Sequence, residues 1–223
     1  MTAEPAEPAK VIVALPVTSP TYFNPRYRSS IARKAKNALR VAEQIGGSAT
    51  VTVILHGRAV DQVGHGSTVA HSEVDQANFD EWAADWAVLP NASSGVLDDP
   101  SPRNEVGRRF GISDSFYGHA QAVDVMNSVM QIRPLSKGLT CVILCLDSRF
   151  GVEEMIRSLA RIDRTNIFWQ ICGDPSDIGY DDFWGKDGLK RGGVVPNLRA
   201  QLSSSWTPWL VARRFKAWRK NRG

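Results

Sequence analysis

The sequence predicts an α/β fold: a three-layer, doubly wound, mostly parallel sheet followed by a basic C-terminal helix. Short apolar runs alternate along the chain with segments of helical periodicity, which is the pattern of a parallel sheet covered on both faces. The 223 residues suffice for one main domain with a sizeable core, because a typical domain has about 100–200 residues. No apolar run approaches the ~20 residues that a membrane-spanning helix needs.

The N-terminal part is expected to begin with a flexible leader, residues 1–9, rich in Pro, Ala and Glu. Residues 11–15 (VIVAL) form a continuous apolar run, typical of a strand buried on both faces. After a proline-rich loop, residues 29–45 repeat apolar side chains on one helical face and end at a Gly-Gly pair. Residues 50–55 (TVTVIL) are then expected to form a second strand.

The rest of the chain continues the alternation of helices and strands. We expect helices at 75–86, 118–131 and 151–162, and strands at 140–146 and 166–172. The last of these strands contains Trp169, which we expect to lie in the core because apolar residues flank it on both sides. The order of these elements favours strands that run parallel, each followed by a covering helix.

Several motifs of catalysis and of nucleotide binding are missing from the sequence. No GxGxxG follows the first strand, and there is no GxxxxGK[ST], GxSxG or HExxH. The three cysteines, Cys141, Cys145 and Cys172, form no CxxC and indicate ordinary buried thiols in a reducing compartment. His65 and His71 fall in a polar stretch and are more typical of solvated loop histidines than of metal ligands.

Several segments resemble a known family. The first strand and its loop (11–27), NFDEW (78–82), FYGHA (116–120), and VILCLD (142–147) followed by IFWQ (167–170) are similar to motifs of the von Willebrand factor A-type (vWA) domain of the bacterial tellurium-resistance kind. This resemblance implies a vWA-like domain. The expected boundaries are a leader at 1–9, the vWA-like domain at 10–200 and a basic, aromatic C-terminal helix at 201–223.

The resemblance also implies a metal-ion-dependent adhesion site, made from a DxSxS run, a later threonine and a strand-end aspartate. Thr18 falls at the first serine, His119 at or next to the threonine, and Asp147 at the aspartate. Pro16 and Pro20 replace the other two DxSxS ligands, and proline has no side-chain oxygen. The remaining ligands are one carboxylate and one hydroxyl, a poor set for Mg²⁺, which requires oxygen ligands in near-octahedral geometry. We therefore expect a degenerate site in which Thr18, His119 and Asp147 are vestigial. The expected cofactor is therefore none, although Mg²⁺ is the ion that an intact site of this kind would take.

The C-terminal segment concentrates positive charge. The chain has a formal net charge of +4, but residues 213–223 carry six cations and no acid, so that the remainder has a net charge of −2. A helix over residues 208–222 would place aromatic side chains on one face and cations on another. The expected partner-binding residues are Arg213, Arg214, Lys216, Trp218, Arg219, Lys220 and Arg222.

Such a helix suits an acidic protein surface, a nucleic acid or an anionic membrane. On this interpretation, residues 208–222 are needed for association but not for folding of the main domain. The alternative is that the aromatic face docks on the domain itself and the cations are merely solvated.

Two functions of different classes follow. We expect a non-enzymatic protein-interaction module of vWA type, cytoplasmic or, if phage-borne, in the virion, with a stress-response or assembly role. The resemblance implies tellurium resistance as its setting. The alternative is a nucleoside deoxyribosyltransferase-like enzyme, because LPVTSPTYFNP at 15–25 is similar to that family's first loop. Its catalytic carboxylates would be Asp147 with Glu153 or Glu154, although acids in a first helical turn are common for electrostatic reasons alone.

Overall fold

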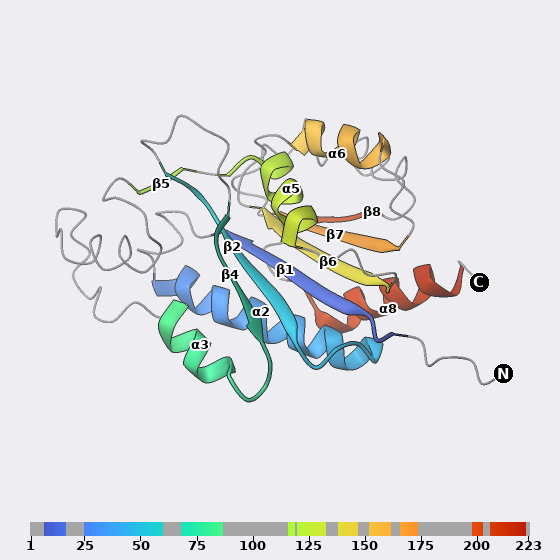
Figure 1. The fold of residues 1–223 in the computed structure, drawn as a ribbon, viewed down its shortest axis with the longest axis horizontal. Coiled ribbons are helices and arrows are strands. Elements are labelled where there is room, and N and C mark those ends of the chain that lie inside the picture. The colour runs from blue at the N-terminus through green and yellow to red at the C-terminus, as the bar shows by residue number, and fades with distance from the viewer. Residues whose placement is uncertain are drawn as a thin grey trace.

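The fold is that of a computed structural model (Figure 1). The structure describes residues 7–16, 25–59, 68–86, 116–118, 120–132, 138–146, 152–161, 166–173, 198–202 and 206–221. The main sheet contains β1 (Lys10–Pro16), β2 (Val51–His56), β4 (Thr68–Val74), β6 (Thr140–Leu146), β7 (Ile167–Gly173) and β8 (Leu198–Leu202). The helices are α2 (Pro25–Ile45), α3 (Phe79–Trp86), α5 (Ala122–Ile132), α6 (Val152–Arg161) and α8 (Pro208–Lys220). Two short strands, β3 (Arg58–Ala59) and β5 (Phe116–Gly118), pair with each other.

The strands of the main sheet lie in the order β4-β2-β1-β6-β7-β8. Strands β2, β1, β6, β7 and β8 are parallel, and the edge strand β4 runs antiparallel to β2. The prediction of an α/β fold with a mostly parallel sheet is therefore confirmed.

The central strands are buried along almost their whole length. All residues of β6 and β7 are buried, and in β1 only Lys10 is partly exposed. A strand with neighbours on both edges and helices on both faces requires apolar side chains at nearly every position, which explains the continuous runs in the sequence. Trp169 of β7 is 1% exposed, so its predicted core position is confirmed.

Helix α2 shows how the sequence ends an element. Gly46 has a φ of +64°, a left-handed conformation that glycine adopts without steric cost. The Gly46 N–H donates to the Glu43 carbonyl at 3.1 Å and the Gly47 N–H to the Ala42 carbonyl at 2.8 Å. These are the two hydrogen bonds of a Schellman motif, so the predicted stop at the Gly-Gly pair is confirmed. The helix begins at Pro25, earlier than expected, because proline is well suited to a first helical position.

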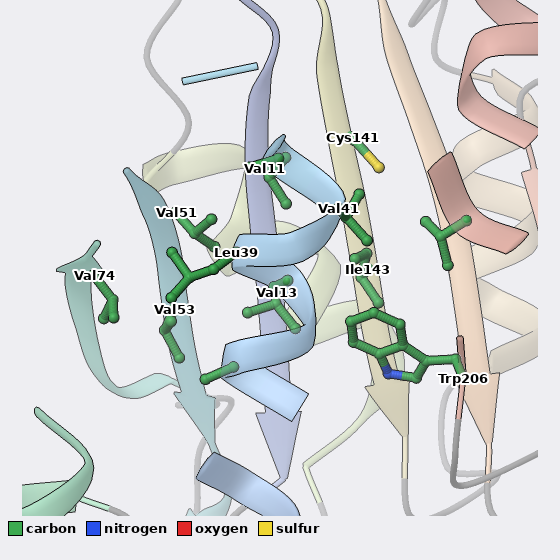
Figure 2. Close-up of a cluster of buried hydrophobic side chains, with 14 of the residues drawn as sticks. Val11, Val13, Leu39, Val41, Val51, Val53, Val74, Cys141, Ile143 and Trp206 are labelled. Atoms are coloured by element: carbon green, nitrogen blue, oxygen red, sulfur yellow. The ribbon is translucent and has the colours of Figure 1, made fainter. Parts of the chain in front are cut away.

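Helices cover both faces of the sheet (Figure 1). On one face, α2, α3 and α8 contribute to a cluster of buried side chains that includes Val13, Leu39, Val53 and Trp206 (Figure 2). On the other face, α5 and α6 pack over a second cluster that includes Met126 and Trp169. Among the described residues, none of the helices combines the length and hydropathy that crossing a bilayer requires.

Some elements differ from the sequence-based expectation. Helix α3 begins at Phe79 instead of residue 75, because Asp75 and Asn78 form a capped turn in which the Asp75 Oδ1 accepts the Asn78 N–H at 2.9 Å. Strands β4 and β8 were not expected. His71 therefore does not lie in a loop: it is exposed on the edge strand β4, opposite Ile54 of β2. The boundary expected between residues 200 and 201 falls inside β8.

Candidate functional site

The order of the strands indicates which edge of the sheet to examine. The strand order reverses between β1 and β6, whose neighbours β2 and β7 continue outward in opposite directions. In open α/β sheets, ligands bind outside the carboxyl ends of the strands at such a reversal. Here those ends are Pro16 of β1 and Leu146 of β6, with His56 and Gly173 at the ends of the adjacent strands.

His56 completes the hydrogen bonding at this reversal. The Lys10 N–H donates to the Leu139 carbonyl at 2.9 Å, and Lys10 is paired with Thr140, so alternate residues of β1 donate to β6. By this register Pro16 would donate to the Cys145 carbonyl, but proline has no N–H. Instead, His56 Nε2 lies 2.9 Å from the Cys145 carbonyl oxygen. Since a carbonyl only accepts, the Nε2 atom carries the proton.

A pair of thiols lies on the α2 and α8 side of this edge. Cys145 of β6 is directly opposite Cys172 of β7 in the sheet register, and each residue is 2% exposed. The Cys172 thiol donates a hydrogen bond to Cys145. The Trp206 Nε1–H also donates to the Cys145 Sγ, at 3.3 Å. The sulfur of Cys145 therefore accepts two hydrogen bonds inside an otherwise apolar cluster.

The pKa values of the two thiols are shifted in opposite directions. The pKa of Cys145 is lowered to about 7, chiefly by the hydrogen bond from Cys172. Burial acts in the opposite direction, whereas the Lys34 charge and the Trp206 hydrogen bond lower the pKa further. Burial, followed by its hydrogen bond to Cys145, raises the pKa of Cys172 well above the ordinary value. The charges of Lys34 and Arg214 oppose that rise. The arrangement therefore favours a thiolate at Cys145 and a thiol at Cys172.

Arg214 brings a positive charge to this cluster from α8. Its guanidinium donates to the Oε1 of Gln170 at 3.1 Å, and Gln170 is completely buried in β7. Gln170 lies two residues before Cys172 on the same strand, so both side chains are on the same face of the sheet. Arg214 thus has a described contact within the domain, whereas the sequence assigned it to a partner surface.

The vestigial metal positions cannot be placed against this geometry. Thr18, His119 and Asp147 lie outside the described residues, as does His65. Within the described ranges, no three His, Cys, Asp or Glu side chains gather in a way that could hold a metal ion. The enzyme alternative requires Asp147 together with Glu153 or Glu154. Glu154 is exposed on α6, and its partner Asp147 lies outside the described residues.

Helix α8 divides its side chains between the core and the surface. Val211 and Phe215 are 0% exposed, and the Phe215 ring meets the Phe168 ring of β7 edge to face at 5.8 Å. Trp218 is 7% exposed and packs on both rings. Trp218 is therefore a core residue, and we remove it from the proposed partner surface.

The remaining cations of the tail lie at the surface. The exposed ones are Arg213, Lys216, Arg219 and Lys220, whereas Arg222 lies outside the described residues. Arg213, Lys216 and Lys220 have the spacing i, i+3, i+7 and thus share one side of the helix. Trp209, 60% exposed, extends this stripe by one turn, and the Arg213 guanidinium lies 4.6 Å from its ring centroid. We call Trp209, Arg213, Lys216 and Lys220 the basic stripe.

The sequence predicted the three cations of the basic stripe, but neither Trp209 as a member of it nor the thiol pair. Cys145 and Cys172 were expected to be ordinary buried thiols, and both are free and buried; their pairing across the sheet was not expected. The available signal was position: each cysteine lies at or next to the carboxyl end of a predicted strand, and two such strands side by side bring their ends together. Which strands are neighbours, and in which register, could not be obtained from the sequence.

Comparisons with known proteins add no family to this picture. Neither the protein-family models nor the curated proteins give a match to this chain.

Proposed function

We propose that this protein is a non-enzymatic interaction module, a three-layer, doubly wound domain of vWA type, whose basic stripe on α8 binds an acidic surface of another protein. The observation that carries the proposal is the division of α8. Its apolar face is fixed in the core by Phe215, which leaves the cations of the opposite side in a defined place on the surface.

The surroundings of the stripe support a protein partner. Helix α2 packs beside α8 and exposes Arg33 and Arg40, which add positive charge to the same side of the molecule. Trp209 gives the stripe an exposed aromatic residue, and Trp and Arg are enriched at the energetically important positions of protein interfaces. Only Arg219 and Lys220 lie in the last turn, where the helix dipole alone would favour cations. The helix dipole therefore does not account for Arg213 and Lys216.

The proposal is tested by capturing partners from cells that express the protein naturally. The bait is the full chain, as wild type and as the triple variant Arg213→Glu, Lys216→Glu, Lys220→Glu. The control is Arg157→Glu, Arg161→Glu, which reverses two exposed cations on α6, a helix of the opposite face. All three baits are compared with and without nuclease treatment.

We expect the wild type and the α6 variant to capture at least one protein that stays bound after nuclease treatment and that the α8 variant does not capture. Loss of every α8-dependent protein on nuclease treatment would instead assign the stripe to nucleic acid. Identical captures by all three baits would refute a binding role for the stripe.

A further inference from the structure

The thiol pair has the geometry of a disulfide precursor. Neighbouring strands are about 4.8 Å apart, and disulfides join Cα atoms about 4.4–6.8 Å apart. Cys145 and Cys172 are register partners on β6 and β7 and belong to the same buried cluster. A bond between the two sulfur atoms therefore requires side-chain movement and no change in strand pairing.

The surroundings distinguish the roles of the two sulfurs. Cys145 accepts hydrogen bonds from Cys172 and from the Trp206 indole, and the Lys34 charge favours its negative form. A thiolate is the reactive form of cysteine, so Cys145 is the nucleophile. Cys172 stays protonated and is within reach to act second.

Cys141 provides a contrast within the same strand. It is 0% exposed and belongs to the same cluster, but its partner across the sheet is Phe168. Burial alone raises the pKa of Cys141 well above the ordinary value. Cys141 therefore has neither the acidity nor the second thiol.

We propose that Cys145 and Cys172 form a peroxide-reactive dithiol that closes to a disulfide across β6 and β7. The Cys145 thiolate attacks one oxygen of a hydroperoxide, the O–O bond breaks, and a sulfenic acid forms as the other oxygen leaves and takes up a proton. The Cys172 sulfur then attacks the sulfenic sulfur, the S–O bond breaks, and the Cys172 proton leaves with the hydroxyl as water. The two thiols lose two electrons, and the peroxide gains them.

Burial limits the oxidant. Because each cysteine residue is only 2% exposed, the reactant has to be as small as hydrogen peroxide, and bulky disulfide reagents should react poorly with the folded protein. The proposal does not depend on the basic stripe, so either can fail without the other.

The test treats the reduced, folded, full-length protein with hydrogen peroxide, removes the peroxide, unfolds the protein with an alkylating reagent present to block the remaining thiols, and maps the peptides by mass spectrometry. Trypsin leaves Cys141 and Cys145 on one peptide, since the nearest cleavage sites are Lys137 and Arg149. The variant Cys141→Ser therefore makes the linkage unambiguous.

The expected product, in wild type and in Cys141→Ser, has lost two hydrogens, links Cys145 to Cys172 and reverts with dithiothreitol. Cys172→Ser should stop at a sulfenic acid on Cys145, which dimedone traps when it is added together with a denaturant after the peroxide has been removed. The rate should rise as pH passes through about 7, and Trp206→Phe should shift that rise to higher pH, because the indole hydrogen bond stabilises the thiolate. A purely structural thiol pair would give no such pH profile.

Two results would overturn the proposal. One is a folded wild-type protein whose three thiols all stay reduced while the same peroxide oxidises them after unfolding. The other is oxidation of Cys141 at the same rate as Cys145, which would indicate global opening. Both use the wild-type chain, so they remain decisive even if a variant does not fold.

Discussion

Replacing Phe215 with alanine tests whether α8 is part of the core. Phe215 is 0% exposed and touches the rings of Phe168 and Trp218 with centroid distances of 5.8 and 5.3 Å. Truncating a buried phenylalanine costs ~3–5 kcal/mol of folding free energy. Each aromatic pair contributes ~0.5–1.5 kcal/mol beyond the buried area, which places the expected loss in the upper part of that range.

Urea unfolding followed by circular dichroism measures this loss. With an m value of ~3 kcal/mol/M, near the upper end of the usual range, a loss of about 4.5 kcal/mol lowers the midpoint by roughly 1.5 M. The matched control is Trp209→Ala in the same helix. Trp209 is 60% exposed, and its contact with Arg213 should be worth no more than about 1 kcal/mol.

Equal midpoints for Phe215→Ala and Trp209→Ala would refute the docking of α8. The docked helix also revises the sequence-based expectation that residues 208–222 can be removed without affecting folding. Because Val211 and Phe215 contribute to the core cluster, truncation after Leu210 should destabilise the whole domain.

Three further predictions concern other parts of the molecule. Gly47→Ala should lower the melting temperature measurably more than Gly46→Ala, because a Cβ at residue 47 would lie 2.6 Å from the Ala9 carbonyl oxygen, whereas a Cβ at residue 46 meets nothing within 4 Å and only the positive φ is unfavourable. Thiolate absorbance at 240 nm should rise by about one thiolate as pH increases through about 7, and Cys145→Ser should abolish this step, because Cys145 is the thiol whose pKa is lowered in the folded chain. Mg²⁺ or Mn²⁺ should not raise the melting temperature, whereas an ion bound at 100 times its Kd would add ~2.7 kcal/mol to the free energy of unfolding. A rise in melting temperature that Asp147→Ala abolishes would contradict the expectation of a degenerate site.

The central strands were predictable because burial on both faces leaves a continuous apolar run. The edge strand β4 was not, because among the described residues it pairs only with β2, and its described exposed side chains, His71 and Glu73, are polar. Glu73 of β4, for example, accepts a hydrogen bond from the Thr52 hydroxyl of β2 at 2.7 Å, a contact between the two strands that uses polar side chains. A strand of this kind has the composition of a loop.

The candidate site was predictable only in part. Charge patterning located the cations of α8, since helical periodicity is local. The hydrogen bond of His56 depends on the absence of an N–H in Pro16, and the thiol pair depends on strand register. Both are relations between distant segments, which local patterns in one sequence do not contain.

The salt dependence of partner binding tests the central claim most directly. The protein that wild type retains after nuclease treatment is measured against the full chain as NaCl is raised from about 50 to about 500 mM, over which the Debye length falls several-fold. Binding through the basic stripe predicts that the affinity falls steeply and that reversal of Arg213, Lys216 and Lys220 reproduces the loss at low salt. An affinity that stays constant with salt and survives the charge reversal would contradict the account.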